Sequence, residues 1–290
     1  MAATQVAIIP ERVGILSVLR EQLELSSPLS TLAAAYRTAK PYPHLILDDF
    51  LDPKLLDAVV AEMPSLNREN WVHEQDETLI KYNLRSAVDL GPAGYRLVSF
   101  LHSAGFLYLL SELTGIADLL PDPYLQGSGY HIMPKGGFFQ IHADRNTAYS
   151  TGLTRRLAFI TYLNKSWRHE YGGQLELWNL DGSRQEVVIE PHFNRTVIFE
   201  ITDQNFHGVP KTIACPDGRS RNSFALYYHT VGAEGVREFT PHSSIYAPSF
   251  YQKKRSTFSK LFRDWIPPVL GRAIHKLRHS SADKNGNYRS

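Results

Sequence analysis

The sequence predicts an α+β protein in which helices come first and short strands follow. In the first 120 residues apolar side chains recur at helical spacing, as in Leu55, Leu56, Val59 and Val60. From Tyr124 onward short apolar segments alternate with glycine- and proline-containing turns. Seven or eight short strands at this spacing are typical of a sandwich or barrel. Helices followed by strands indicate α+β packing.

The helical part divides at prolines. Residues 1–40 show helical spacing, which ends at Pro41-Tyr42-Pro43 because proline disfavours helix in the preceding residue. Residues 44–50 predict a short strand. Asp52 and Pro53 then predict a helix start, with the aspartate as N-cap and the proline in the first helical position. Residues 95–120 predict a second helical block, whereas the polar residues 66–92 predict a loop or lid.

The strand-rich part is bounded by turn residues such as Gly136-Gly137 and Gly172-Gly173. The expected strands are residues 130–133, 138–141, 157–163, 174–178, 186–190, 196–200 and 223–229. We therefore expect three segments within one functional domain. These are an N-terminal helical support with a lid at 1–123, a strand-rich core at 124–246 and a basic tail at 247–290.

Charge is unevenly distributed along the chain. The net charge is +2 over 290 residues, but from Lys253 onward there are ten Lys/Arg and two acidic residues. The body is therefore mildly acidic, and the basic tail predicts either contact with an anionic surface or a solvated end. Residues 258–277 predict a basic amphipathic helix pair. Because the body is acidic and the tail lies far from the candidate site in sequence, no nucleic-acid partner is expected.

The chain has one cysteine, Cys215, so no internal disulfide forms. Residues 1–10 lack the basic start of a secretory signal, and no run of 18 apolar residues occurs. We expect a cytoplasmic protein without a transmembrane segment. The oligomeric state is not predicted.

A metal site is predicted from three side chains. His142 and Asp144 are two residues apart, and side chains at this spacing on a strand face the same side. His207 lies at the start of a later strand region and can complete the set. Two imidazoles and one carboxylate suit iron(II), because they leave open coordination positions for oxygen chemistry. His131, His169, His192 and His229 are interpreted as ordinary structural histidines.

A fixed cation follows the metal-ligating histidine. Arg221 comes 14 residues after His207, at the start of a strand, and its guanidinium could hold a dicarboxylate by two parallel hydrogen bonds. Arg219, two residues earlier on the same face, remains the alternative. Together with the metal site, this arginine points to an iron enzyme that uses 2-oxoglutarate and O2.

Residues 130–230 resemble the catalytic core of the 2-oxoglutarate/Fe(II)-dependent dioxygenases, within the prolyl 4-hydroxylase-like group. The resemblance covers about a third of the chain. The matching pieces are Gly136-Gly137-Phe138-Phe139, His142-Ala143-Asp144, Arg156-Leu157, Tyr162-Leu163-Asn164-Lys165-Ser166-Trp167, Tyr171-Gly172-Gly173-Gln174-Leu175, His207-Gly208-Val209 and Arg221-Asn222-Ser223.

This resemblance implies a double-stranded β-helix, or jelly roll, with supporting N-terminal helices and a short helical C-terminal tail. His142, Asp144 and His207 would bind Fe(II). Arg221 and Tyr162 would hold the distal carboxylate of 2-oxoglutarate, with O2 as oxidant and ascorbate as a candidate additional cofactor. Because the carboxylate of Asp144 is retained, the expected reaction is hydroxylation of an unactivated C–H bond, releasing succinate and CO2.

The substrate class stays open between an amino acid, peptidyl proline and a small metabolite. Residues 66–92 and 146–156 are expected to form the rim of the site, because long polar loops beside a barrel often bind ligands. Trp71, Arg145, Arg155 and Trp178 are candidate contacts. Two alternatives remain. One is a metal-dependent hydrolase or isomerase on a cupin-like barrel, and the other is a non-catalytic metal-binding jelly-roll module.

Overall fold

The computed structural model describes residues 23, 25, 27–66, 71–84, 86–232 and 241–248. The chain divides into two compact units, Met1–Ala247 and Pro248–Ser290, and the account below concerns the first. The predicted helices within residues 1–22 and 258–277 lie outside the described residues. The basic tail lies there too, so its contact with an anionic surface stays a prediction, as does the predicted boundary at residue 123.

The described part contains four α-helices and two short 3₁₀ helices. The α-helices are α2 (Leu29–Thr38), α3 (Pro53–Glu62), α4 (Pro92–Leu101) and α5 (Ala104–Thr114), and the 3₁₀ helices are η1 (Ala87–Asp89) and η2 (His169–Tyr171). The predicted start of α3 is confirmed, because the Asp52 carboxylate accepts a hydrogen bond from the Lys54 backbone N–H at 2.9 Å.

The predicted helical block 95–120 is two helices rather than one. Ser103 interrupts it, with an extended backbone and a hydroxyl that accepts from the Phe106 N–H at 3.3 Å. A serine favours this N-cap role because its side chain satisfies an N–H that has no partner within the helix. Among the described residues no single helix is long and apolar enough to cross a membrane. α4 and α5 reach that criterion only as a pair, which is bent by 52°.

Within the described residues, twelve strands form one curled sheet in which every named pair is antiparallel. They are β1 (His44–Leu47), β2 (Trp71–Gln75), β3 (Leu79–Leu84), β4 (Gly129–Pro134), β5 (Phe138–Ala143), β6 (Thr154–Tyr162), β7 (Leu175–Trp178), β8 (Gln185–Ile189), β9 (Thr196–Glu200), β10 (His207–Val209), β11 (Ser220–Thr230) and β12 (Ile245–Tyr246).

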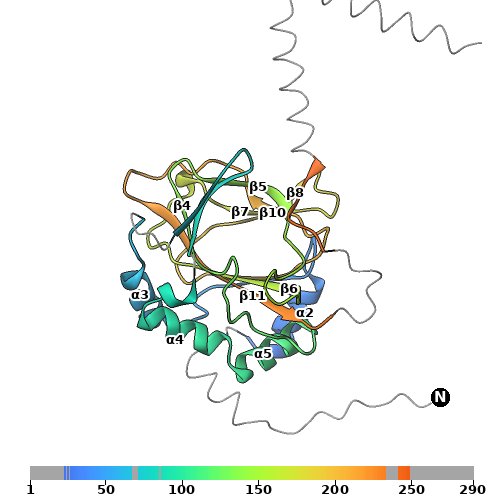
Figure 1. Cartoon of the computed structure of the whole chain (residues 1–290). Coiled ribbons are helices and arrows are strands. Elements are labelled where there is room, and N and C mark those ends of the chain that lie inside the picture. The colour runs from blue at the N-terminus through green and yellow to red at the C-terminus, as the bar shows by residue number, and fades with distance from the viewer. Residues whose placement is uncertain are drawn as a thin grey trace, which may run out of the picture. The chain divides into compact units, whose positions relative to one another are not determined.

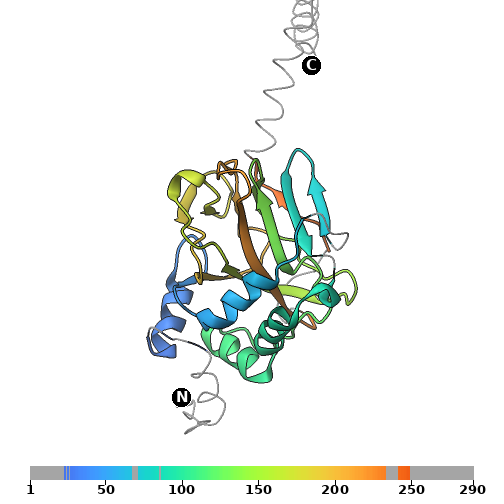
Figure 2. The same cartoon turned by 90° about the vertical axis from the view of Figure 1, so that its left-hand side faces the viewer.

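The sheet curls into two facing layers, as expected for a jelly roll (Figure 1). Its strand order is β1-β9-β6-β11-β4-β3-β5-β10-β7-β8, with β12 added to β5 and β2 added to β3. β6 and β11 lie in one layer, and β5, β10 and β7 lie in the other (Figure 1). The helices cover the outer face of the β6–β11 layer, and a perpendicular view shows the same arrangement (Figure 2).

The structure corrects the prediction that residues 66–92 form an irregular loop. They contain the β2–β3 hairpin and η1 rather than an irregular loop, and β3 lies within the sheet between β4 and β5. The apolar alternation of a strand is weak here because inward positions are polar. Lys81 lines a cavity, and Asn83 donates to the Glu74 carboxylate at 2.6 Å. These positions face polar surroundings, so their residue types resemble those of a loop.

The main hydrophobic core lies between the helices and the β6–β11 layer. Phe106 of α5 packs edge-on against Phe159 of β6 at 5.7 Å and lies 6.4 Å from the Tyr228 ring of β11. The buried Tyr228 hydroxyl also donates to the Leu101 carbonyl oxygen at 3.0 Å, which ties β11 to the end of α4. This packing holds β6 and β11 firmly, and their opposite faces line the interior of the curled sheet.

Candidate metal centre

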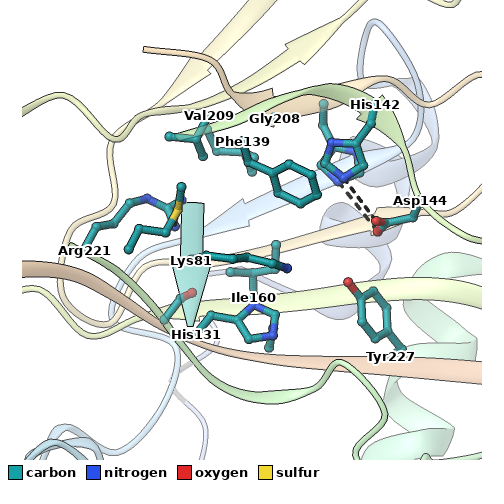
Figure 3. Close-up of a pocket in the computed structure, with 15 residues that line it drawn as sticks. Lys81, His131, Phe139, His142, Asp144, Ile160, Gly208, Val209, Arg221 and Tyr227 are labelled. Atoms are coloured by element: carbon teal, nitrogen blue, oxygen red, sulfur yellow. Dashed lines mark hydrogen bonds and ion pairs between the residues drawn. The ribbon is translucent and has the colours of Figure 1, made fainter. Parts of the chain in front are cut away.

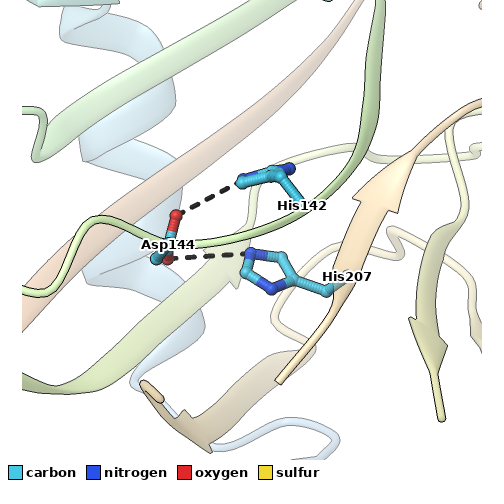
Figure 4. Close-up of side chains that lie close together, drawn as sticks. All are labelled: His142, Asp144 and His207. Atoms are coloured by element: carbon cyan, nitrogen blue, oxygen red, sulfur yellow. Dashed lines mark ion pairs between the residues drawn. The ribbon is translucent and has the colours of Figure 1, made fainter. Parts of the chain in front are cut away.

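His142, Asp144 and His207 are brought together inside the curled sheet. β10 pairs with β5 so that His207 lies directly opposite His142, and Asp144 follows β5. One candidate ligand atom from each residue lies within 4.8 Å of the others. The His142 Nε2 atom is 3.4 Å from Asp144 Oδ1, and His207 Nε2 is 3.6 Å from Oδ2 (Figure 4). A strand pairing thus joins two histidines that are 65 residues apart in sequence.

The backbone orients both imidazoles. The Nδ1 atom of His142 lies 2.8 Å from the Gln140 carbonyl oxygen, and that of His207 lies 3.1 Å from the Asn205 carbonyl oxygen. A carbonyl oxygen only accepts, so Nδ1 carries the proton and Nε2 presents a lone pair. Burial lowers the pKa of His207 to about 4, which keeps that ring neutral.

The donor set fits a divalent cation. His142 Nε2 is buried and has no hydrogen-bond partner, although a buried polar atom normally has one. Burial raises the pKa of the Asp144 carboxyl, but His207, His142 and Arg155 outweigh it and hold that pKa below its usual range. The carboxylate is therefore ionised beside two lone pairs. A soft or borderline divalent ion satisfies all three groups.

A pocket joins this centre to Arg221. The residues that line it come from β3, β4, β5, β6, β7, β10 and β11 and from Asp144. They are Lys81, His131, Met133, Phe139, His142, Asp144, Ile160, Leu175, His207, Gly208, Val209, Arg221, Ser223, Ala225 and Tyr227. Arg221 lies at one side of the pocket and the His142–Asp144 pair at the other (Figure 3).

Arg221 is a buried cation without an acidic partner among the described residues. It is 5% exposed, and its guanidinium donates to the Gly173 carbonyl oxygen, to the Met133 sulfur and to the Tyr162 hydroxyl at 2.6, 3.6 and 3.3 Å. A buried charge of this kind is costly unless an opposite charge reaches it. An anionic ligand that enters the pocket would supply that charge, which fits the distal carboxylate of 2-oxoglutarate.

The structure separates the two candidate arginines and qualifies the position of Tyr162. Arg219 lies outside the pocket, where its guanidinium donates to the Lys165 carbonyl oxygen at 2.7 Å. Tyr162 is fully buried but is not among the residues that line the pocket. Its contact is with Arg221, whose guanidinium lies over the tyrosine ring at 4.9 Å. In this structure Tyr162 orients the arginine.

Several pocket residues were missed by sequence reasoning. Ser223, Ala225 and Tyr227 follow Arg221 at every second position of β11, so the two-residue period of a strand could have identified them. His131 was interpreted as structural, and its Nε2 does lie 2.8 Å from the Gly127 carbonyl oxygen, but it also lines the pocket. Lys81 carried no sequence signal, because its strand was not recognised.

The four rim candidates separate into two groups. Trp71 packs in the main core and donates to the Ser65 carbonyl oxygen at 3.0 Å. Trp178 donates to the Glu176 carboxylate at 3.0 Å and packs beside Phe206. Neither lines the pocket. Arg145 and Arg155 lie near Tyr227, which does line it.

Comparisons with known proteins agree with this geometry. A family model described as the 2OG-Fe(II) oxygenase superfamily matches residues 128–229, the stretch that contains all three candidate metal ligands and Arg221. The chain is 29% identical over 118 residues to a Xenopus laevis protein and 27% identical over 198 residues to one from Mus musculus, each named Prolyl 3-hydroxylase OGFOD1. These matches cover 39% and 65% of this chain but only 22% and 33% of the relatives.

Solved structures show the same fold. A Pseudomonas putida prolyl-4-hydroxylase superposes with a TM-score of 0.50 at 18% identity, covering 71% of this chain and all of that one. A Trichoplax adhaerens prolyl hydroxylase, solved with a peptide fragment of hypoxia inducible factor, gives 0.50 at 18% identity and covers 76% and 94% of the two chains. Residues 128–229 thus match the 2OG-Fe(II) oxygenase superfamily model, and the chain shares its fold with these solved prolyl hydroxylases.

Proposed function

We propose that this chain is an Fe(II)- and 2-oxoglutarate-dependent dioxygenase that hydroxylates an unactivated C–H bond. The observation that carries the proposal is a single pocket with candidate metal ligands at one end and a buried cation at the other. Three buried candidate metal-ligand atoms gather at one end, and at the other lies the buried cation of Arg221, which has no acidic partner among the described residues. A metal-dependent hydrolase on the same barrel would explain the first end but would leave the buried guanidinium without a role.

The roles of the residues follow from their positions. His142, Asp144 and His207 would hold Fe(II), and Arg221 would bind the distal carboxylate of 2-oxoglutarate, with Tyr162 keeping the guanidinium in place. Iron held there, with 2-oxoglutarate and O2, would supply the oxidising power for hydroxylation, and 2-oxoglutarate would be converted to succinate and CO2. Ascorbate stays a candidate additional cofactor.

The walls of the pocket orient a metal-ligand side chain and limit the access of water. Phe139 stacks on the His142 ring with 3.8 Å between centroids, and Ile160, Leu175 and Val209 add apolar surface between the two ends. Apolar walls limit the entry of water, and a dry site strengthens the charge contacts that hold the ligands. The stacked phenyl ring also fixes the plane of a ligand imidazole, which keeps its lone pair directed inward.

The substrate is proposed as an amino acid, a peptidyl proline or a small metabolite. Proteins named as prolyl hydroxylases among the relatives and neighbours support a peptidyl proline, although this chain spans a third or less of the length of the curated relatives. A cytoplasmic location is likewise proposed. The single cysteine supports it, and fractionation of cells producing the protein would test it.

The proposed function is tested by conversion of 2-oxoglutarate to succinate. Protein loaded with Fe(II) under air should form succinate, with or without a substrate. His142→Ala removes one of three ligands, so we expect loss of bound iron and a decrease in turnover of at least about 100-fold. Iron content measured on the same preparations separates loss of metal from loss of fold. A wild type that binds iron but forms no succinate would contradict the oxygenase and favour a hydrolase or a non-catalytic module.

A further inference from the structure

Three cations lie near the Asp144 side of the pocket, away from Arg221: Lys81 lines the pocket, whereas Arg145 and Arg155 do not line it and lie near its wall residue Tyr227. Lys81 extends across the pocket away from Arg221, and Tyr227 stands on the side that holds Asp144 (Figure 3). Burial raises the pKa of the Tyr227 phenol, and the charges of Asp144, Arg155, Glu74 and Arg145 also act on that pKa. The Arg155 guanidinium contacts the Tyr227 ring directly, so this wall of the pocket, beside the candidate metal centre, lies in the field of several charges.

Among the described residues neither arginine forms an ion pair with a carboxylate, although the charge of Asp144 acts on Arg155 and that of Glu74 on Arg145. The Arg145 guanidinium lies over the Tyr149 ring at 3.7 Å, and that of Arg155 lies over the Tyr227 ring at 4.0 Å. The Nε atom of each is buried and without a hydrogen bond. Arg155 is only 6% exposed, and its guanidinium donates to the Gln126 carbonyl oxygen, a neutral group. Stacking on aromatic rings holds both guanidinium planes but does not neutralise their charge.

The acids nearby do not balance these cations. Glu74 lies 3.5 Å from the Lys81 ammonium and also accepts from Asn83, so its charge is already shared. Asp144 would be neutralised by the metal ion in the proposed holoenzyme. Of the two described acids whose charges act on Tyr227, only Glu74 then remains to offset Lys81, Arg145 and Arg155. Such an excess of positive charge attracts an anion. The rings of Tyr149 and Tyr227 beside the arginines add apolar surface, which suits an organic anion.

Resting on the proposed function, we propose that the substrate carries a carboxylate close to the carbon that is oxidised, and that Lys81, Arg145 and Arg155 bind it. The site thus has two anion-binding ends, with Arg221 for the co-substrate and the three cations for the substrate. Binding at the second end would place a neighbouring C–H bond over the metal centre. The carboxylate belongs either to an acidic side chain of a peptide or to a free amino acid.

The experiment compares matched probes that differ only in charge. The Fe(II) protein is held without oxygen, with N-oxalylglycine in place of 2-oxoglutarate, and binding is measured by calorimetry. One pair is an Asp-Pro-Asp peptide and its Asn-Pro-Asn counterpart, both blocked at the ends, and the other is N-acetylproline and its amide. We expect the acidic member of at least one pair to bind at least about tenfold more tightly, and the pair that discriminates identifies the source of the carboxylate.

Variants that remove one cation at a time test which side chains cause the preference for the acidic probe. Arg145→Gln keeps an extended side chain but removes the charge, and we expect it to lose most of the discrimination, as Lys81→Gln should. Arg37 of α2 is exposed on the helical side of the fold, so Arg37→Gln is the matched control and should keep the preference. Iron content of each preparation shows whether the neighbouring Asp144 still functions.

Three results would overturn the proposal. They are equal binding within both pairs, no binding of either acidic probe, and an undiminished preference in both Arg145→Gln and Lys81→Gln. Succinate formation without substrate reports on the oxygenase assignment alone. Succinate formation without preferential binding of an acidic probe would contradict only this inference. Preferential binding of an acidic probe without succinate formation would contradict only the proposed function.

Discussion

At the scale of single residues, the site is built from buried polar groups whose hydrogen bonds or charges the rest of the fold does not satisfy. His142 Nε2 is buried without a partner, and Arg221 is a buried guanidinium with only neutral partners among the described residues. Each such group costs stability unless a ligand completes it. The protein thus holds its ligand-binding atoms in place before the ligands arrive, and binding energy is not spent on ordering them.

Arg221 provides the residue-scale prediction. In Arg221→Lys the charge is kept, but a compact ammonium cannot reproduce the planar fork that meets Gly173 and Tyr162 and leaves donors for a carboxylate. We expect the KM for 2-oxoglutarate to rise by about 10- to 100-fold with a smaller change in kcat. Steady-state rates of succinate formation at varied concentrations of 2-oxoglutarate measure both constants.

Arg219→Lys is the matched control for this prediction, since Arg219 lies outside the pocket. Its KM should equal that of the wild type. If instead Arg219→Lys raises the KM and Arg221→Lys does not, the cation that binds the co-substrate has been misidentified.

At the scale of elements, the pairing of β10 with β5 brings two of the three candidate metal ligands together. The register places His207 opposite His142, and the turn before β10 supplies the Asn205 carbonyl oxygen that fixes the His207 ring. Gly208 permits this close pairing. A Cβ atom there would lie 2.8 Å from the backbone oxygens of both Phe139 and Gln140. Backbone atoms of a paired strand cannot move aside, so only glycine fits.

Gly208→Ala should therefore push β10 away from β5 and separate the two imidazoles. We expect iron affinity to fall by at least about tenfold, because ligand geometry is set by this pairing. We also expect a loss of unfolding free energy of about 1–3 kcal/mol from overpacking. Titration of the apo-protein with Fe(II) without oxygen measures the first effect, and urea denaturation the second.

Gly232→Ala is the control at this scale, because a Cβ atom there would meet nothing within 4 Å. It should leave both quantities within error of the wild type. Iron affinity that is unchanged in Gly208→Ala would show that strand separation does not govern the centre.

At the scale of the whole molecule, the helices serve the site from the opposite face of the sheet. Residues of β11 alternate, with Ser223, Ala225 and Tyr227 lining the pocket and Phe224, Leu226 and Tyr228 packing in the main core. The core therefore anchors the strand whose other face binds ligands. The same packing encloses His102 and His229, whose ring nitrogens include three buried atoms without partners.

These two histidines predict a pH dependence of stability. Burial lowers the pKa of His102 and of His229 to about 4, from the usual 6.5. Between these values the unfolded chain binds protons that the folded chain does not, so stability is complete above pH 6.5 and decreases as the pH falls toward 4. We expect His229, which is 1% exposed, to contribute a loss of about 2 kcal/mol near pH 4.5.

Urea unfolding of the apo-protein near pH 4.5 and near pH 7 measures this loss. His229→Gln should reduce the difference between the two conditions, whereas replacement of the exposed His192 by Gln should not. An equal difference in all three proteins would assign the acid sensitivity to other groups.

The sequence by itself determined the cap of α3 and most of the strands that line the pocket, and it predicted His142, Asp144, His207 and Arg221 as site residues. These features are local, because spacing within a strand or helix decides which side chains share a face. Only the tertiary structure placed β3 and its Lys81 inside the sheet, put Arg221 in the pocket and Arg219 outside it, and brought Arg155 against Tyr227. Those outcomes depend on which strands pair and in what register, and pairing is set by contacts between residues that are distant in the chain.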